Sequence, residues 1–258
     1  MSWLKPFTSK PSAELQRYLA VRERMSHIMS ACAASLLPEE VVATAKKLGL
    51  RHRIGPDDEL VLVRVYEAAA FHYRRRGETG IARALRNLPA DASALDRHIL
   101  EGCLRCRWSI YEIVCIHSQE GGDLRDTLDG TVLQVWDEGL ASEMKTGEYA
   151  AVRLVPIGDL WVTSGPAIVG PRITLAEAAR HCLPPAWHDP ANWPAQGTPE
   201  HDDLILTLMR GNHPFGEDEG FSAPIGVAAP SLTGEPTRKA PCPCGSGKKY
   251  KHCCGKGT

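Results

Sequence analysis

The strongest constraint on the fold is a change of sequence pattern near Cys103. Before this point apolar residues recur at helical spacing, as in Ser12–Leu36, where Leu15, Leu19 and Ile28 stand among charged positions. After it come short segments rich in Val, Ile, Trp and Tyr, separated by turns that contain glycine and aspartate. A run of helices followed by a run of strands favours an α+β fold over alternating α/β units.

Several helix boundaries can be read from the sequence. Pro38 stands at a first turn beside two acidic residues, and two lysines precede Gly49, so both ends suit the helix dipole. Thr174 with Glu177 three residues later forms a capping-box pattern. We therefore expect one helix from Pro38 to about Gly49 and another that begins after Thr174.

The segments after Cys103 predict strands in an antiparallel meander, either a sheet against the helices or a small open barrel. Trp108, Trp136 and Trp161 are typical of the core of such a β-domain. In an OB-like barrel the same residues would instead form a platform for stacking bases.

These patterns divide the chain into five regions. The stretch after the last predicted helix is rich in Gly, Pro, Ser and acidic residues, and a flexible linker of that length spans roughly 25–30 Å. The predicted regions are a helical region (1–102), an antiparallel β-domain (103–172), a helical and proline-rich connector (173–214), a flexible linker (215–240) and a metal-binding module (241–258).

Charge is unevenly distributed along the 258 residues. The net charge is −1, but residues 238–258 hold six Lys or Arg and no acidic residue, which leaves 24 basic against 31 acidic residues in 1–237. A basic tail of about +6 on a body of about −7 indicates a tail that meets an acidic partner, such as RNA, a membrane surface or an acidic protein patch.

The cysteines and the apolar runs indicate the compartment. No apolar run is long enough to span a bilayer, and the N-terminal residues lack a hydrophobic signal core. An odd number of cysteines, nine, without a signal peptide favours reduced thiols. We therefore expect a cytoplasmic protein.

Four of the nine cysteines lie in the last seventeen residues, at Cys242, Cys244, Cys253 and Cys254. Two pairs around a Gly-Ser-Gly turn suit tetrahedral zinc, whose binding would supply the folding energy of so short a segment. Disulfides or a redox pair are the alternatives, and His252 is a substitute ligand. Four protein ligands leave no position for water, so this zinc would be structural rather than catalytic.

The segment PCPCGSGKKYKHCC resembles the SEC-C motif, named for the C-terminus of the preprotein translocase ATPase. The resemblance implies one structural zinc on the four cysteines and contact with a protein partner, a chaperone or the ribosome. On this basis we expect the partner-binding side chains to be Lys248, Lys249, Tyr250 and Lys251. The body resembles uncharacterised bacterial proteins with SEC-C tails behind a helical domain and a β-domain ending in W-x-x-S-G, here Trp161–Gly165.

The body carries one further candidate cluster. Cys103 and Cys106 form a C-x-x-C pair, and Cys115 and His117 follow on a predicted strand. A second metal site, a redox pair and buried idle thiols are all open readings. The body has no H-E-x-x-H, G-x-S-x-G or G-x-G-x-x-G pattern, so we expect no catalytic residues.

Three functions follow from the sequence. The first is a non-enzymatic bacterial protein whose zinc tail recognises a protein partner. The second is nucleic-acid binding by the basic tail together with the β-domain. The third is an enzyme of unknown reaction that uses the tail as a docking device.

Overall fold

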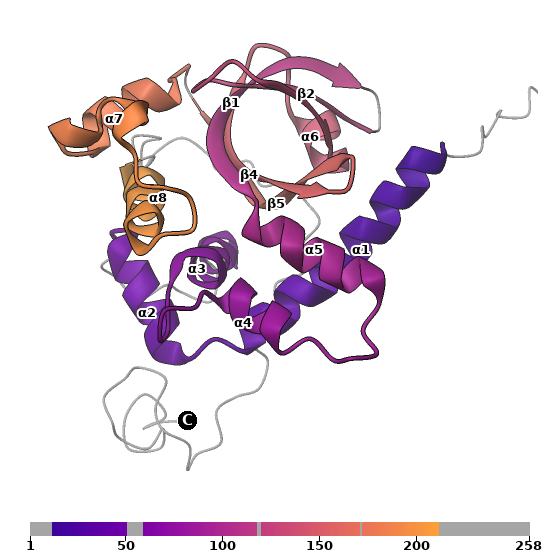
Figure 1. Cartoon of the computed structure of the whole chain (residues 1–258). Helices are drawn as coiled ribbons and strands as arrows, with labels where there is room; N and C mark the ends of the chain where they lie inside the picture. The colour runs from indigo at the N-terminus through magenta and orange to yellow at the C-terminus, as the bar shows by residue number, and fades with distance from the viewer. Residues whose placement is uncertain (1–11, 51–58, 118–119, 171, 212–258) are drawn as a thin grey trace, which may run out of the picture.

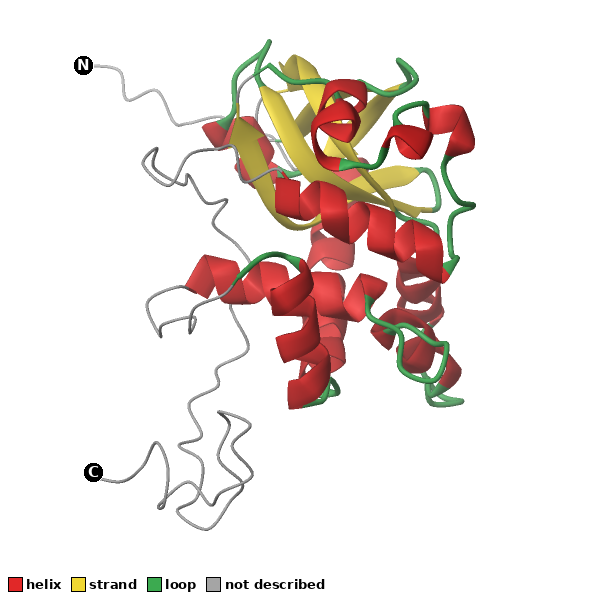
Figure 2. Cartoon of the chain, turned by 90° about the vertical axis from the view of Figure 1, so that its left-hand side faces the viewer, coloured by secondary structure: helices red, strands yellow, loops and turns green. Residues whose placement is uncertain are grey.

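A computed structural model of the chain describes residues 12–50, 59–117, 120–170 and 172–211. A layer of helices lies against one side of a small β-barrel, so the predicted α+β class is confirmed (Figures 1 and 2). The helices are α1 (Ala13–Ala34), α2 (Pro38–Lys47), α3 (Glu59–His72), α4 (Gly80–Arg86), α5 (Ala94–Leu104), α6 (Glu138–Glu143), α7 (Leu175–Cys182) and α8 (Pro199–Gly211). The strands are β1 (Arg107–His117), β2 (Gly121–Asp126), β3 (Val132–Trp136), β4 (Tyr149–Ile157) and β5 (Leu160–Gly170).

Helix α1 packs through one stripe of side chains. The buried residues recur three and four positions apart, which is the spacing of one helical face: Tyr18, Val21, Met25, Ile28 and Cys32. Leu19, which the sequence pattern placed among the apolar positions, lies off this stripe and is 38% exposed. The stripe faces α3, α4 and α5 and joins them in one core.

The predicted helix boundaries agree with the structure. Helix α2 begins at Pro38, and the Glu40 carboxylate accepts a hydrogen bond of 2.7 Å from the backbone N–H of Leu37. Helix α7 begins after Thr174, whose hydroxyl caps the N–H of Glu177 while the Glu177 carboxylate accepts from the Thr174 N–H. Both contacts satisfy backbone donors that a helix leaves unpaired at its start.

The five strands close into a barrel in the order β1-β2-β3-β5-β4. Neighbouring strands are antiparallel except for β3 and β5, which run parallel and close the barrel. Helix α6 lies between β3 and β4 in the sequence, so strand order and helix position correspond to the OB-fold. The barrel is therefore closed, and β2 is a strand that the sequence patterns did not predict.

Two glycines explain why β2 reads as a turn in the sequence. A Cβ at Gly121 would lie 1.9 Å from the carbonyl oxygen of Val135, and a Cβ at Gly122 would lie 2.4 Å from that of Cys115. Only glycine allows the three backbones to approach so closely. The Gly-Gly pair thus marks a tight place inside the barrel wall rather than a connection between strands.

The barrel presents two different surfaces. Its covered face, on β4 and β5, packs against α1, α3 and α5, and α7 and α8 pack against side chains of β1, β4 and β5. The open face consists of outward residues of β1, β2 and β3 that are exposed or half-buried: Glu112, Cys115, His117, Asp123, Arg125, Val132 and Gln134. Alternate residues of the same strands, such as Ile113, Leu124 and Val135, fill the barrel interior.

Among the described helices, none alone has the length and apolar character needed to cross a membrane. Helices α1 and α2 meet that criterion only when taken as a pair, and a bend of 101° separates them.

Candidate functional site

The predicted zinc module and the linker before it lie outside the described residues. This holds for the four predicted zinc ligands, Cys242, Cys244, Cys253 and Cys254, and for the predicted partner-binding residues, Lys248, Lys249, Tyr250 and Lys251. They remain predictions from the motif. The structure describes three other places where functional side chains gather, all in or beside the barrel.

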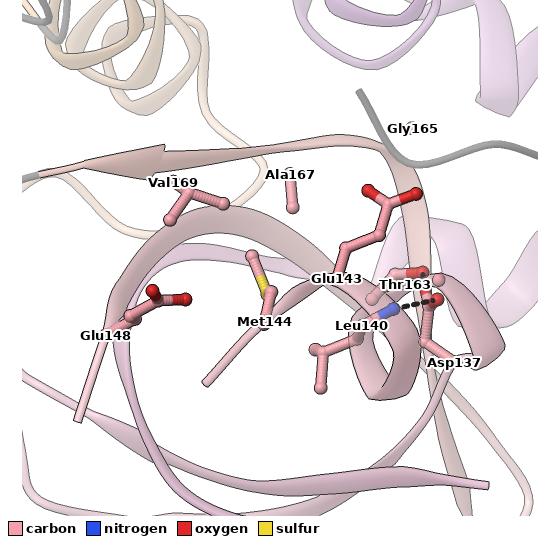
Figure 3. Close-up of a pocket in the computed structure, with 10 residues that line it drawn as sticks. Asp137, Leu140, Glu143, Met144, Glu148, Thr163, Gly165, Ala167 and Val169 are labelled. Atoms are coloured by element: carbon pink, nitrogen blue, oxygen red, sulfur yellow. Dashed lines mark hydrogen bonds between the residues drawn. The ribbon is translucent and has the colours of Figure 1, made fainter. Parts of the chain in front are cut away.

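The first is a pocket of about 160 Å³ at one end of the barrel, beside α6 (Figure 3). Three carboxylates, of Asp137, Glu143 and Glu148, line it together with the thioether of Met144. The Asp137 carboxylate already accepts hydrogen bonds from the backbone N–H of Leu140 at 2.9 Å and from the Thr163 hydroxyl. The pocket is smaller than the roughly 300–1,000 Å³ of typical ligand sites, so it has room for a small group only.

The open face lacks the features of a nucleic-acid surface. Trp108 and Trp136 are buried, and Trp136 packs against Tyr18 of α1 with 6.1 Å between ring centroids. Trp161 is half-buried against the barrel core. Of the seven residues that define the open face none is Phe, Tyr or Trp, and its charged side chains include both signs. The tryptophans therefore belong to packing, as expected for core residues, and not to a stacking platform.

The structure separates the four residues that the sequence grouped as a second cluster. Cys103 is buried at the end of α5 and Cys106 directly precedes β1, whereas Cys115 lies nine residues further on, roughly 25–30 Å along an extended strand. Burial raises the pKa of the Cys103 thiol well above its ordinary value and that of Cys106 to about 11. Burial thus lowers the thiolate fraction of both residues below that of an ordinary cysteine, which reduces their nucleophilicity.

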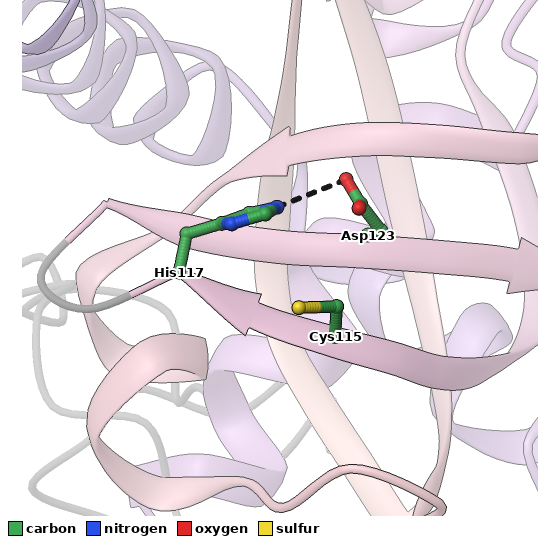
Figure 4. A group of neighbouring side chains, drawn as sticks. All are labelled: Cys115, His117 and Asp123. Atoms are coloured by element: carbon green, nitrogen blue, oxygen red, sulfur yellow. Dashed lines mark ion pairs between the residues drawn. The ribbon is translucent and has the colours of Figure 1, made fainter.

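The second place is on the open face, where Cys115 and His117 meet a residue that the sequence did not single out. Asp123 of β2 lies opposite Cys115 in the strand register, and its Oδ1 atom is 3.1 Å from Nε2 of His117 (Figure 4). One potential ligand atom from each of these three side chains lies within 4.8 Å of the other two. A thiol, an imidazole and a carboxylate at these separations form a possible metal-binding group.

The third place is a buried polar network where the helices meet the covered face. The junction network joins α3 to β4, β5 and α8, and its members are Glu67, His72, Arg74, Arg153, Ser164 and Asp202. Arg153 is fully buried, donates to the Glu67 carboxylate and lies 4.0 Å from the centre of the Phe71 ring. Its charge is therefore compensated on one side by an anion and on the other by an aromatic face.

The hydrogen bonds of the junction network fix the state of His72. Arg153 can only donate, so Nε2 of His72 accepts its hydrogen bond at 2.7 Å and Nδ1–H donates to Asp202 at 3.0 Å. Burial, supported by the charge of Arg153, lowers the pKa of His72 to about 4 in spite of Asp202. Asp202 also accepts from Nε of Arg74 at 2.6 Å. Except for Nε of Arg153, which has no hydrogen-bond partner, these groups bond to one another, and the network joins the helices to the barrel.

Gly165 lies directly beside the junction network. A Cβ at Gly165 would lie 2.3 Å from the Glu67 carboxylate, and the residue adopts φ +71°. The last residue of the W-x-x-S-G pattern is thus a glycine because the Glu67 side chain occupies the space of a side chain there. One signal in the sequence points to this network, namely Arg153 in the middle of an apolar strand, YAAVRLVPI.

Comparison with known proteins divides the chain in two. The family described as "Family of unknown function (DUF7986)" matches residues 12–173, and the SEC-C motif matches residues 238–256. The first match spans helices α1 to α6 and the complete barrel but not α7 and α8, and the second spans the predicted zinc ligands. No solved structure matches the chain.

The curated relatives match only around the tail. The chain is 82% identical over 22 residues to the "Protein translocase subunit SecA" of Nitratiruptor sp. and 90% identical over 19 residues to that of Dichelobacter nodosus. It is 54% identical over 43 residues to the same subunit of Campylobacter curvus. These matches cover 7–16% of the chain and only 2–5% of the relatives. By its body the chain belongs to the DUF7986 family of unknown function, and it carries in addition a SEC-C motif, which is a zinc-binding module.

Proposed function

We propose that the protein binds one structural zinc through Cys242, Cys244, Cys253 and Cys254 and uses this tail to contact a protein partner. The observation that carries the proposal is the identity of 82–90% with translocase subunits over 19–22 residues. These identities fall on the tail alone, which supports a module with a function of its own. The partner is a chaperone or the ribosome, as the family resemblance implies.

The chemistry of the tail supports a recognition role rather than catalysis. Four thiolates complete the coordination of zinc and leave it no open position for a substrate. The site would carry a charge of about −2, which the six Lys and Arg residues of 238–258 exceed. The surface offered by Lys248, Lys249, Tyr250 and Lys251 is thus cationic with one aromatic ring. An acidic patch with an apolar element is the complementary partner surface.

The test is a pull-down from bacterial lysate with the full chain and a matched variant. In Lys248→Glu/Lys249→Glu/Lys251→Glu the zinc ligands are intact, so zinc content is expected to stay at the wild-type level while the captured partners are lost. A control, Arg97→Glu on the exposed surface of α5, changes the charge of the body and should keep the partners. Identical partner lists from wild type and tail variant would sink the proposal.

A cytoplasmic location forms part of the proposal. Zinc ligation requires reduced thiols, and the cysteines of the described residues are all free: Cys32, Cys103, Cys106, Cys115 and Cys182. Trapping of the thiols with an alkylating reagent in intact cells would reveal the reduced state, and a disulfide between tail cysteines would contradict it.

Nucleic-acid binding is the second candidate, because the barrel has the strand order of the OB-fold. The buried tryptophans and the mixed charges of the open face leave the tail lysines as the source of affinity. Binding would then fall steeply with salt and show little sequence preference. A filter-binding titration that retains no RNA or DNA at low salt would remove this candidate. The enzyme hypothesis has the least support, since the sequence shows no catalytic pattern and burial raises the pKa of the Cys103 and Cys106 thiols.

A further inference from the structure

The group formed by Cys115, His117 and Asp123 is built by the barrel backbone itself. A register shift between Ile113 and Cys115 interrupts the ladder of β1 and β2, and after it Cys115 pairs with Asp123. Directly opposite residues in a sheet point to the same side, and so do residues two apart in one strand. The bulge therefore places all three side chains on the open face, and they come from two hydrogen-bonded strands rather than from loops.

The separations in this group suit a tetrahedral metal. With Zn–N near 2.0–2.1 Å and Zn–O near 2.0–2.2 Å, two ligand atoms of a tetrahedron lie about 3.4 Å apart. Nε2 of His117 and Oδ1 of Asp123 are 3.1 Å apart. All three ligand atoms fall within 4.8 Å of one another, so the thiol, the imidazole and the carboxylate are near enough to share one zinc ion.

The short contact between His117 and Asp123 is not an ordinary hydrogen bond. Nε2 of His117 is shielded from solvent and has no hydrogen-bond partner, although the Asp123 oxygen is so near. The two atoms approach each other without the alignment that a hydrogen bond requires. The Cys115 thiol donates to the carbonyl oxygen of Ile116 at 3.8 Å, which is a weak hydrogen bond. Three potential ligand atoms thus lie close together without forming hydrogen bonds to one another, as the ligands of a common metal ion do.

We propose that Cys115, His117 and Asp123 bind a second divalent transition metal ion, zinc, separate from the zinc of the tail. A thiolate and a carboxylate together neutralise the charge of the ion, and the mixed sulfur, nitrogen and oxygen set favours zinc over calcium or magnesium. Three protein ligands leave the fourth position open toward solvent on the open face. This site therefore takes a water molecule or a ligand from outside, unlike the closed four-cysteine site.

The experiment measures metal in the full chain after removal of the tail site. In the variant Cys242→Ser/Cys244→Ser/Cys253→Ser/Cys254→Ser we expect one zinc per chain to survive gel filtration, against two in the wild type. Adding Cys115→Ser to this variant should weaken zinc binding by more than about 100-fold, because loss of even an outer-shell partner of a metal site costs 10- to 100-fold. Adding Cys182→Ser instead, at a half-buried thiol on α7, should leave the one zinc in place.

Cobalt substitution tests the identity of the ligands. The body site contains one thiolate, so its cobalt form should show about a quarter of the sulfur-to-metal charge-transfer absorbance of the four-thiolate tail. Asp123→Asn preserves the size of the side chain and should lower affinity while the thiolate band persists. A tail variant that holds no metal, or that keeps its metal when Cys115 is replaced, would overturn the proposal. Neither result would touch the proposed function of the tail, which the lysine variant tests.

Discussion

The covered and open faces of the barrel differ in how far their ion pairs are buried. On the covered face Arg153 and Glu67 form an ion pair with side chains 0% and 8% exposed, enclosed by α3 and held further by His72 and Ser164. On the open face Arg125 and Glu112 pair at 2.9 Å with side chains 45% and 22% exposed. The buried pair Arg153–Glu67 joins the helices to the barrel. The exposed pair Arg125–Glu112 lies on the surface beside side chains that a ligand can reach.

The largest expected effect comes from breaking the covered pair. Arg153→Ala leaves Glu67 buried without its cation, and removing one partner of a buried ion pair costs about 3–5 kcal/mol. Urea unfolding at neutral pH would measure the loss. The double variant Arg153→Met/Glu67→Gln carries no unpaired charge and is expected to lose less. Equal losses in single and double variants would contradict a charge-based role.

Lowering the pH should reduce the stability of the protein through His72, which lies at the covered face. The pKa of His72 falls from its ordinary 6.5 to about 4 on folding, because the ring is buried. Between these values the unfolded chain binds a proton that the folded chain does not, so stability is full above pH 6.5 and declines as the pH falls toward 4. The total corresponds to about 3 kcal/mol.

The variant His72→Gln tests that origin. It removes the titrating ring, so its stability should depend less on pH between 6.5 and 4 than that of the wild type. The difference between the two profiles reports on His72, because the carboxyl groups of Glu67 and Asp202 belong to the same network and are present in both. Parallel profiles would show that His72 is not the source.

A side chain at Gly165 should disturb the junction network, because the Glu67 carboxylate lies directly against this glycine. Gly165→Ala combines a positive φ with a Cβ placed 2.3 Å from the Glu67 carboxylate, for which we expect a loss of about 2–3 kcal/mol. Gly158 is a matched control, because it has φ +65° and nothing within 4 Å of the added Cβ. Gly158→Ala should cost only the backbone term of about 1–2 kcal/mol. Thermal unfolding of both variants gives the comparison, and equal shifts would argue against the contact with Glu67.

The smallest effect is expected on the open face. Arg125→Ala removes one partner of a solvent-exposed pair, for which typical losses are about 0.2–1 kcal/mol. The same urea titration measures it, and added salt should reduce the loss further. A loss as large as that of Arg153→Ala would abolish the distinction between the two faces.

Local signals in the sequence were sufficient for the starts of α2 and α7, whereas α6 (Glu138–Glu143), inside the predicted β-domain, was not predicted. Pro38 and the pair Thr174–Glu177 act through contacts within one turn, and the structure has them as expected. The open-face strand β2 could not be predicted in this way, because Gly121 and Gly122 are required by backbones that lie close only after the barrel has closed. Backbone contacts between strands that are distant in the sequence produce no periodic pattern of apolar residues.

The candidate sites follow the same division. The tail ligands are recognisable because two cysteine pairs and a turn are contiguous in sequence. Cys115 and His117 could be singled out because thiols and imidazoles bind metals. Asp123 could not, because only the strand register after the bulge places it beside them. Because they are near in the sequence, Cys115 and His117 were grouped with Cys103 and Cys106. The extended strand β1 separates the two pairs in space.

The parallel pairing of β3 with β5 has a consequence for synthesis of the chain on the ribosome. The barrel cannot close, and the covered face cannot exist, until β5 (Leu160–Gly170) has emerged. Helices α1 to α5 end at Leu104, so they are synthesised more than fifty residues before β5. In that interval α1 already has its helical partners α3, α4 and α5. Tyr18 and Phe71 lack the barrel side chains Trp136 and Arg153, against which they lie in the folded protein, until the barrel forms. Part of the apolar surface of the helical layer is therefore uncovered until β5 is made, and such exposure favours aggregation.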